Sequence, residues 1–393
     1  MKQVLQHLKN GKTTVEEVPI PGLKRNCALV QTAASLVSAG TERMVVEFAE
    51  KNLLAKAASR PDLVKQVIQK ARREGVITSM EAAFNKLDQP MVLGYSSAGT
   101  VVEVSEDLQG FSPGDRVACA GGGYAVHAEY AVVPRNLLVH LPDTVDFESA
   151  AFATLGAIAM QGFRLAQPQI GEFVCIIGLG LLGLLTVQIA RAAGCIVFGV
   201  DISQDRVNLV QKMGFAAAKR EDCIDLISGF TRGRGFDHVL ICADTSSSDP
   251  VELAGEIARD RGTVVAVGAV GFQIPRKKYY EKELIFKVSR SYGPGRYDPQ
   301  YEEKGIDYPL GYVRWTEGRN IESFIDLLSA GKVDVKPLIT HRYPIAEAPN
   351  AYELITGKTG QPFLGVLLTY PQKPIDQKPE RKIALAAVQN PTP

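Results

Sequence analysis

The chain has 393 residues, 46% of them hydrophobic and 22% charged, which is the composition of an ordinary globular protein of about two domains. Its net charge is +1, so no bulk electrostatic field points to nucleic acid or to a membrane surface as the partner. Six cysteines without a CxxC pair, and a start (MKQVLQHLKN) without an apolar core, predict a reduced, cytoplasmic protein with neither disulfides nor a signal peptide.

The first 150 residues read as β-structure with one interruption. Short apolar runs separated by turns predict strands over residues 1–40. Residues 42–88 change character, because helical periodicity and many charges predict two or three helices there. Strand patterns return over 91–142, and a helix is expected to begin near Phe147.

The most informative stretch is residues 173–201, which read as strand, glycine turn, helix, strand and acid. An apolar run leads into Gly178-Leu-Gly180-Leu-Leu-Gly183. In this fingerprint the first glycine permits a tight turn, the second lets the backbone approach a pyrophosphate, and the third lets helix and strand pack closely. The alternative is a membrane span, but the three glycines and the early Arg191 argue against it.

Asp201 ends the second apolar run, 18 residues after Gly183. A carboxylate there binds both hydroxyls of the adenosine ribose and repels a 2′-phosphate, so the sequence predicts NAD(H) rather than NADP(H). The candidate cofactor contacts are Gly178, Gly180, Leu181, Leu182, Gly183, Asp201, Arg206 and Gly268.

Strand and helix patterns alternate from 173 to about 290, which predicts an α/β fold with a doubly wound parallel sheet. Residues 290–319 follow and are rich in Tyr, Arg and Gly. A helix is expected over 321–330 and β-like segments over 338–370. The tail, 371–393, holds five prolines and resembles a linker.

Several motifs together resemble the medium-chain dehydrogenase/reductase superfamily. They are Gly94 to Gly99, Phe111-x-Pro113-Gly-Asp-Arg-Val117, Ala128-Glu-Tyr130, the glycine fingerprint and Ile339-Thr-His341. The resemblance implies a GroES-like catalytic domain interrupted by a Rossmann NAD-binding domain, and a homodimer. The expected boundaries are 1–153 with 319–370 for the first, with a helical insertion at 42–88, and 154–318 for the second.

The metal-ligand positions depart from the pattern of the zinc members. Where those carry Cys-Gly-Thr-Asp-x-His, this chain has Ala39-Gly-Thr-Glu-Arg-Met44, and their Gly-His-Glu is Gly94-Tyr95-Ser96 here. A later ligand position falls at about Ala153, and the four-cysteine lobe is missing. Because zinc needs N, S or carboxylate ligands, this comparison predicts an enzyme without zinc.

Within the superfamily the chain is similar to oxidoreductases fused to a second, Gfo/Idh/MocA-type domain, which occur in polysaccharide biosynthesis. The matching stretches are Ser38 to Arg43, Leu93 to Gly99, Ser289 to Tyr301 and Tyr308 to Glu317. This resemblance implies a fused or associated domain after residue 393.

Four side chains are candidates for proton transfer or for polarising a substrate oxygen. Tyr95 replaces a metal ligand, and its alternative is a packed aromatic. Thr41 takes the place of a relay hydroxyl, or caps a helix. His127 has an unperturbed pKa near neutral, although a surface or strand-end histidine is the simpler interpretation. Thr154 is expected by the nicotinamide, or as a cap.

The segment 289–319 is the candidate for substrate recognition. Arginines can bind phosphate or carboxylate in a fork, and tyrosine or tryptophan faces can stack on a sugar or base. The residues concerned are Arg290, Tyr292, Arg296, Tyr297, Tyr312, Arg314 and Trp315. The same composition suits a subunit interface.

The leading hypothesis is an NAD(H)-dependent oxidoreductase acting on a small-molecule substrate, a sugar or sugar nucleotide. Reduction of an activated C=C bond is the alternative reaction, although Asp201 disfavours the NADPH used by such reductases. A third possibility is a dehydrogenase homologue that binds nucleotide without turnover.

Overall fold

The computed structural model describes residues 1–51 and 89–374, which form two compact units. Of the described residues, unit 1 holds 1–51, 89–116, 121–133 and 341–374, and unit 2 holds 117–120 and 134–340. The predicted helices between 52 and 88 and the linker-like tail from 375 lie outside the described residues.

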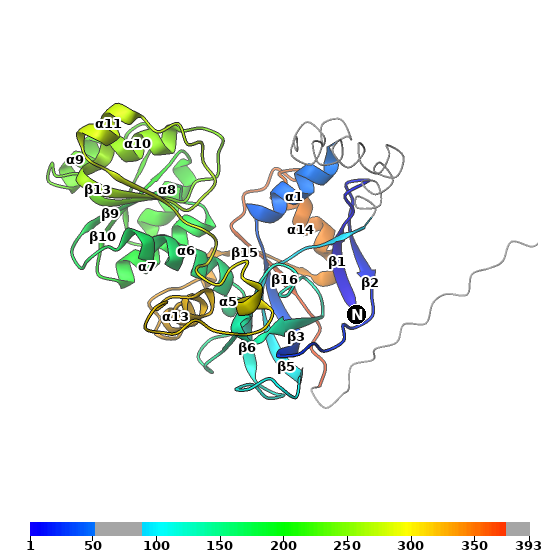
Figure 1. Ribbon diagram of the computed structural model, residues 1–393. Helices are drawn as coiled ribbons and strands as arrows, with labels where there is room; N and C mark the ends of the chain where they lie inside the picture. Colours follow the sequence, from blue (N-terminus) through cyan, green and yellow to red (C-terminus); the bar gives the residue numbers. More distant parts are fainter. Residues whose placement is uncertain (52–88, 375–393) are drawn as a thin grey trace, which may run out of the picture. The chain divides into compact units, whose positions relative to one another are not determined.

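Unit 1 is built mainly of antiparallel strands (Figure 1). Its elements are β1 (Lys2–Gln6), β2 (Thr13–Glu17), β3 (Cys27–Val37), α1 (Thr41–Glu50), β4 (Met91–Val92), β5 (Ser96–Val104), β7 (Tyr130–Pro134), β15 (Ile339–Pro344), α14 (Ala348–Ile355) and β16 (Gly365–Thr369). The long strand β3 pairs with β5 on one side and with β16 on the other. A segment from the end of the chain therefore completes a sheet that the first hundred residues begin.

One sequence expectation for this unit needs correction. The β-like reading of residues 338–370 holds for β15 and β16, but the helix α14 lies between them. Its apolar residues pack into the core of unit 1 beside β16, at Ala351, Leu354 and Ile355. A helix that packs against a sheet is rich in apolar residues, as a buried strand is. Composition alone therefore did not distinguish α14 from a strand.

Unit 2 contains a six-stranded parallel sheet of order β11-β10-β9-β12-β13-β14. Its strands are β9 (Phe173–Ile177), β10 (Ile196–Asp201), β11 (Ala216–Lys219), β12 (Phe236–Ile241), β13 (Ala258–Ala266) and β14 (Ile285–Val288). Numbered along the chain this order is 3-2-1-4-5-6, the arrangement of a doubly wound dinucleotide-binding sheet. The predicted fold class is therefore confirmed.

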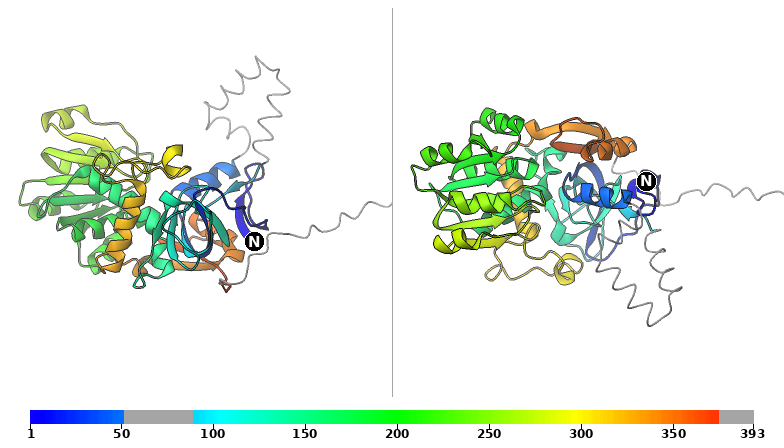
Figure 2. Two further views of the ribbon diagram at one scale, coloured as in Figure 1. Left: turned by 60° about the horizontal axis from the view of Figure 1, so that its bottom comes forward. Right: turned by 90° about the horizontal axis from the view of Figure 1, so that it is seen from above.

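Helices cover both faces of this sheet, with α10 and α11 on one side and α6 and α7 on the other (Figures 1 and 2). The helices of unit 2 are α5 (Phe147–Ala150), α6 (Ala153–Ala166), α7 (Leu181–Ala192), α8 (Gln204–Lys212), α9 (Cys223–Phe230), α10 (Asp249–Ile257), α11 (Arg276–Glu281), α12 (Pro299–Glu302) and α13 (Glu317–Ser329). Two short strands, β6 (Arg116–Ala120) and β8 (Leu138–His140), pair antiparallel in this part of the chain.

The parallel strands bury their side chains on both faces, as the continuous apolar runs predict. Cys175 and Val239 are fully buried on one face, and Val174 and Ile176, which point to the opposite face, are fully buried as well. All strands of a parallel sheet point the same way, so the loops after β9, β12, β13 and β14 emerge at one edge. In this fold, ligands bind at the edge formed by the carboxyl ends of the strands.

Candidate functional site

The glycine loop after β9 has the close contacts that its fingerprint requires. Gly178 has φ +93°, a left-handed conformation that disfavours other residues. A Cβ on Gly183 would lie 1.9 Å from the Gly178 carbonyl oxygen, so only hydrogen fits there. Gly180 precedes the first turn of α7, where unpaired backbone N–H groups and the helix dipole favour a phosphate.

Asp201 holds this loop from the end of β10. The side chain is 9% exposed, and its Oδ2 accepts a hydrogen bond from the backbone N–H of Leu179 at 2.6 Å. Its Oδ1 accepts one from the backbone N–H of Ser203 at 2.8 Å. The carboxylate is thus fixed beside the glycine turn, the position from which an acid can bind ribose hydroxyls.

The other candidate cofactor residues surround the same edge of the sheet. Leu181 and Leu182 form the half-buried first turn of α7, and the half-buried Arg206 brings its Nη1 within 2.8 Å of the site a Cβ on Gly180 would take. Gly268 follows β13, where a Cβ would lie 2.1 Å from the Ala243 carbonyl oxygen. A hollow of about 390 Å³ opens beside it, lined by Asp244, Thr245, Ser246, Ala269, Val270, Gly271 and Phe272.

Unit 1 contains a buried polar network that the sequence interpretation missed. The Glu42 carboxylate, 2% exposed, accepts hydrogen bonds from the Tyr352 hydroxyl at 2.5 Å and from the backbone N–H of Ser38 at 2.9 Å. Its Oε2 also lies 3.1 Å from Nε2 of His127. The sequence did indicate that Glu42 would be buried, because helical spacing puts it on the same face as the apolar Val46 and Ala49, which are buried.

His127 lies at the centre of this network. The side chain is fully buried, with Nε2 against Glu42 and Nδ1 2.6 Å from the Ser35 hydroxyl. Ser35 in turn bonds the Tyr370 hydroxyl at 2.6 Å. Both ring nitrogens are engaged in buried contacts, so His127 occupies neither the surface position nor the strand-end position that the sequence suggested.

Tyr95 and Thr41 lie near the same network. The half-buried Tyr95 donates its hydroxyl hydrogen bond to Ser38 Oγ at 2.7 Å. Burial raises the pKa of Tyr95 to about 12, and the neighbouring Glu42 charge acts in the same direction. The phenol therefore stays protonated at neutral pH and can donate a hydrogen bond. Thr41 is exposed and is the first residue of α1, where Gly40 takes the N-cap position.

Thr154 and the arginine- and tyrosine-rich segment belong to unit 2. Thr154 is fully buried in the first turn of α6, with Phe152 at the N-cap. Tyr292 is buried, whereas Tyr297 and Tyr312 are 59% and 90% exposed. The guanidinium carbons of Arg164 and Arg314 lie 3.1 Å and 3.8 Å from the ring centroid of Trp315.

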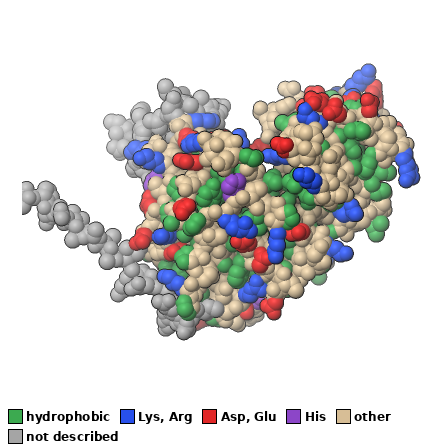
Figure 3. Space-filling model, turned by 180° about the vertical axis from the view of Figure 1, so that it is seen from behind, with side chains coloured by type: hydrophobic (Ala, Val, Ile, Leu, Met, Phe, Trp, Pro, Cys, Tyr) green, Lys and Arg blue, Asp and Glu red, His purple; other side chains and the backbone are tan. Residues whose placement is uncertain are grey.

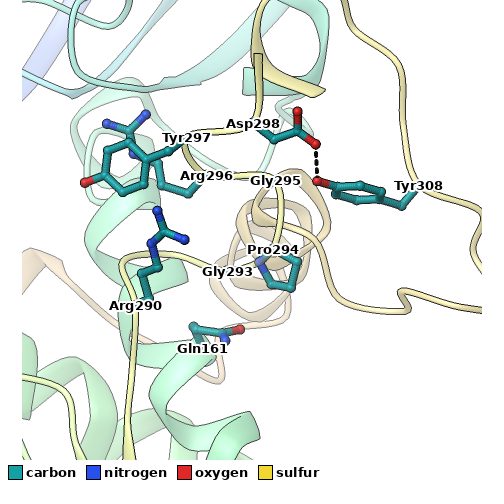
Figure 4. Close-up of a pocket in the computed structure, with 9 residues that line it drawn as sticks. All are labelled: Gln161, Arg290, Gly293, Pro294, Gly295, Arg296, Tyr297, Asp298 and Tyr308. Atoms are coloured by element: carbon teal, nitrogen blue, oxygen red, sulfur yellow. Dashed lines mark hydrogen bonds between the residues drawn. The ribbon is translucent and has the colours of Figure 1, made fainter. Parts of the chain in front are cut away.

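A second hollow of about 390 Å³ lies in this segment and includes some of the predicted substrate residues (Figure 4). Its lining is Gln161, Arg290, Gly293, Pro294, Gly295, Arg296, Tyr297, Asp298 and Tyr308. Arg296 and Tyr297 therefore meet at one site, whereas Tyr292, Tyr312, Arg314 and Trp315 are not part of its lining.

Two protein-family models match the chain. The alcohol dehydrogenase GroES-like domain matches residues 66–143, and the zinc-binding dehydrogenase domain matches residues 182–307. Their order, together with the fold, supports membership of the medium-chain dehydrogenase/reductase superfamily. The matches and the relatives below identify the chain as an oxidoreductase.

Curated relatives agree with this class. Sorbitol dehydrogenase of Halalkalibacterium halodurans is 29% identical over 323 residues, which cover 73% of this chain and 84% of that protein. Probable D-xylulose reductase A of Arthroderma otae is 27% identical over 311 residues, covering 70% and 80%. Galactitol-1-phosphate dehydrogenase from Escherichia coli shares the fold, with a TM-score of 0.70 at 22% identity over 94% of this chain and 100% of that one.

The comparisons correct the prediction of an enzyme without zinc. The family model that covers much of unit 2 is that of zinc-binding dehydrogenases, which contradicts the prediction. The prediction compared single ligand positions, whereas the family match rests on the pattern of a whole domain. Within residues 1–51 and 89–374, no three His, Cys, Asp or Glu side chains form a group that could hold a metal ion.

The surface carries charged side chains of both signs. Basic and acidic side chains are interspersed over the face shown in Figure 3, in keeping with the small net charge. Among the described helices, none is both long and apolar enough to cross a membrane.

Proposed function

We propose that this protein transfers hydride between NAD(H) and the alcohol or carbonyl carbon of a sugar or polyol. The observation that carries the cofactor assignment is the hydrogen bond between Asp201 and the Leu179 amide, which fixes a carboxylate at the glycine turn. The polyol assignment follows the relatives, which include sorbitol dehydrogenase and D-xylulose reductase. Oxidation of such a substrate yields a ketose, NADH and a proton.

The nicotinamide, when bound, supplies or accepts the hydride at its C4 atom. The α7 N-terminus and the glycine loop bind the diphosphate, and Asp201 binds the adenosine ribose. Tyr95 is proposed to donate a hydrogen bond to the substrate oxygen, because its raised pKa keeps the phenol protonated. When the Tyr95 hydrogen turns to the substrate oxygen, the Ser38 hydroxyl, with its Oγ 2.7 Å away, can donate to the phenol oxygen and hold it in place. Thr154 is proposed to contact the nicotinamide from the start of α6.

The test is a pair of measurements on the full chain. NADH and NADPH titrations, read by nucleotide fluorescence, are expected to give tight NADH and weak NADPH binding. NAD⁺ reduction is then followed at 340 nm with sorbitol and xylitol, for the wild type and Tyr95→Phe. A fall in kcat of at least tenfold without loss of NADH affinity supports the role of Tyr95. Binding of neither nucleotide would overturn the proposal.

Other features stay predictions. They are the homodimer, the cytoplasmic location, a fused or associated Gfo/Idh/MocA-type domain and a role in polysaccharide biosynthesis. Size-exclusion chromatography with light scattering of the full chain tests the first of them directly.

A further inference from the structure

The hollow at Arg290 and Arg296 has an unusual distribution of charge. Both guanidinium groups lie against the ring of Tyr297, with their central carbons 4.7 Å and 4.1 Å from its centroid. Figure 4 shows the two arginines converging on this ring from different parts of the loop. Two like charges on one aromatic ring repel each other unless an anion neutralises them.

Only one of the two cations has its charge neutralised by the protein. Arg296 forms an ion pair with Glu302, and both side chains are largely buried. Arg290 is exposed, and within the described part of the chain it has no carboxylate partner. Asp298 also lines the hollow, but its carboxylate already accepts hydrogen bonds from the Tyr308 hydroxyl at 2.5 Å and from the Gln300 amide at 2.9 Å. Arg290 therefore remains available to an anionic ligand.

The backbone around the hollow is strained. Ser291 and Tyr297 have positive φ angles of 52° and 67°, which side-chain-bearing residues rarely adopt. Gly293 and Gly295 lie between them, with φ angles of 127° and 108°, and a Cβ on Gly295 would lie 2.6 Å from the Tyr301 ring. For Ser291 and Tyr297, which are not glycines, such conformations cost on the order of 1–3 kcal/mol each, and they concentrate at functional sites.

The position of the loop in the sheet separates it from the cofactor phosphates. It follows β14, at the same edge of the sheet as the glycine loop, but β14 is three strands from β9 in the sheet order. The cofactor diphosphate belongs at the β9 end. An anion bound at Arg290 is therefore expected to come from another molecule.

We propose that this hollow binds the phosphate group of the substrate, with Arg290 as the principal contact and Arg296 as support. A planar guanidinium can donate two parallel hydrogen bonds to phosphate oxygens. The expected substrate is therefore a phosphorylated sugar, either a sugar phosphate or a nucleoside-diphosphate sugar. This inference rests on the proposed function for the reaction, but the binding of phosphate can be measured without it.

The experiment is isothermal titration calorimetry of the full chain with glucose 6-phosphate, UDP-glucose, inorganic phosphate and uncharged glucose. Phosphate-bearing ligands are expected to bind and glucose is not. Arg290→Ala should weaken binding at least tenfold, the usual scale for a charge-assisted contact, and Arg290→Lys should weaken it less. Tighter binding of glucose 6-phosphate would show that the hollow prefers a phosphate monoester. Tighter binding of UDP-glucose would show that it prefers the diphosphate of a nucleoside-diphosphate sugar.

Two further variants separate this site from a general charge effect. Arg276→Ala is the matched control, because Arg276 is also an exposed arginine over a tyrosine ring, 5.3 Å from the centroid of Tyr280, outside the hollow. It should leave affinity unchanged. Asp298→Asn removes a negative charge from the hollow and should strengthen binding about two- to fivefold.

Equal losses in Arg290→Ala and Arg276→Ala, or no phosphate binding at millimolar concentration, would overturn the site. NADH titrations of the same variants distinguish the two proposals. If NADH binds but phosphate affinity does not depend on Arg290, only the site fails. If NADH fails to bind, the proposed reaction fails while the phosphate result stands alone.

Discussion

The Oδ2 atom of Asp201 accepts a hydrogen bond from the backbone N–H of Leu179 at 2.6 Å, across the 22 residues that separate them. One carboxylate thereby joins the end of β10 to the loop that follows β9. The carboxylate that is proposed to bind the adenosine ribose therefore also stabilises the conformation of the glycine loop. Changes at Asp201 should therefore affect both cofactor choice and loop geometry.

Replacing Asp201 with alanine is expected to raise the Kd for NADH at least tenfold, since the ribose loses an acceptor and the Leu179 amide loses its partner. The preference for NADH over NADPH should narrow, because no carboxylate repels the 2′-phosphate. Fluorescence titration measures both constants. Asp205→Ala is the control, an exposed acid nearby in α8. An unchanged NADH affinity in Asp201→Ala would refute the assignment.

Gly183→Ala should destabilise unit 2, because its Cβ would lie 1.9 Å from the Gly178 carbonyl oxygen. Helix and loop must separate, at a cost on the order of 3 kcal/mol. Thermal and urea unfolding measure this loss. Gly229→Ala in α9 is the matched control, since nothing lies within 4 Å of the added Cβ. That helical substitution should stabilise by about 0.5–1 kcal/mol, so a similar result at Gly183 would contradict the close packing.

Glu42→Ala should lower the free energy of unfolding by about 3 kcal/mol, because it leaves buried polar groups of His127, Tyr352 and Ser38 without their acceptor. Urea denaturation gives the value. Glu47→Ala in the same helix removes only an exposed pair with Arg43 and should cost less than about 0.5 kcal/mol. The double variant Glu42→Ala with Tyr352→Phe should lose less than the sum of the single losses. Strict additivity would argue against a coupled network.

Glu317 should make stability depend on pH. Its side chain is fully buried, and neither carboxylate oxygen has a hydrogen-bond partner within the described residues. Burial, and next the charge of Glu302, raise the pKa of Glu317 from 4.5 to about 9. The pKa of Glu317 is higher in the folded than in the unfolded protein, so the folded state keeps the proton more tightly. The stability that goes with this protonated carboxyl is fully present below pH 4.5 and is lost as pH rises toward about 9.

Glu317→Gln keeps the shape and removes the titration. Its melting temperature is expected to exceed that of the wild type at pH 8, with the difference shrinking toward pH 5. Differential scanning fluorimetry across this range measures the trend. Glu322→Gln, an exposed change in the same helix, should follow the wild type. Parallel curves for the wild type and Glu317→Gln would show that Glu317 does not titrate in this window.

The local periodicities of the chain were sufficient for unit 2. Apolar runs, glycine spacing and Asp201 predicted the doubly wound sheet and the loop, because each depends on residues close together in sequence. The helix α14 was missed, since its apolar residues resemble a strand until their partners are known. The zinc prediction failed because single ligand positions were weighed against a pattern that extends over a domain.

The sequence by itself determined the parts whose physics is local: the parallel strands, the glycine turn and the acid that follows it. Only the tertiary structure decided which distant side chains meet. Glu42 and Tyr352 lie 310 residues apart, yet their oxygens are 2.5 Å apart, because β3 and β16 pair and carry their neighbouring helices together. Arg290 and Arg296 are close in sequence, but their convergence on Tyr297 depends on the loop backbone, which has positive φ angles at Ser291, Gly293, Gly295 and Tyr297. Such contacts form because a polar group that is buried on folding needs a hydrogen-bond partner, and that partner can come from anywhere in the chain. The spacing of residues along the sequence does not show which partner it will be.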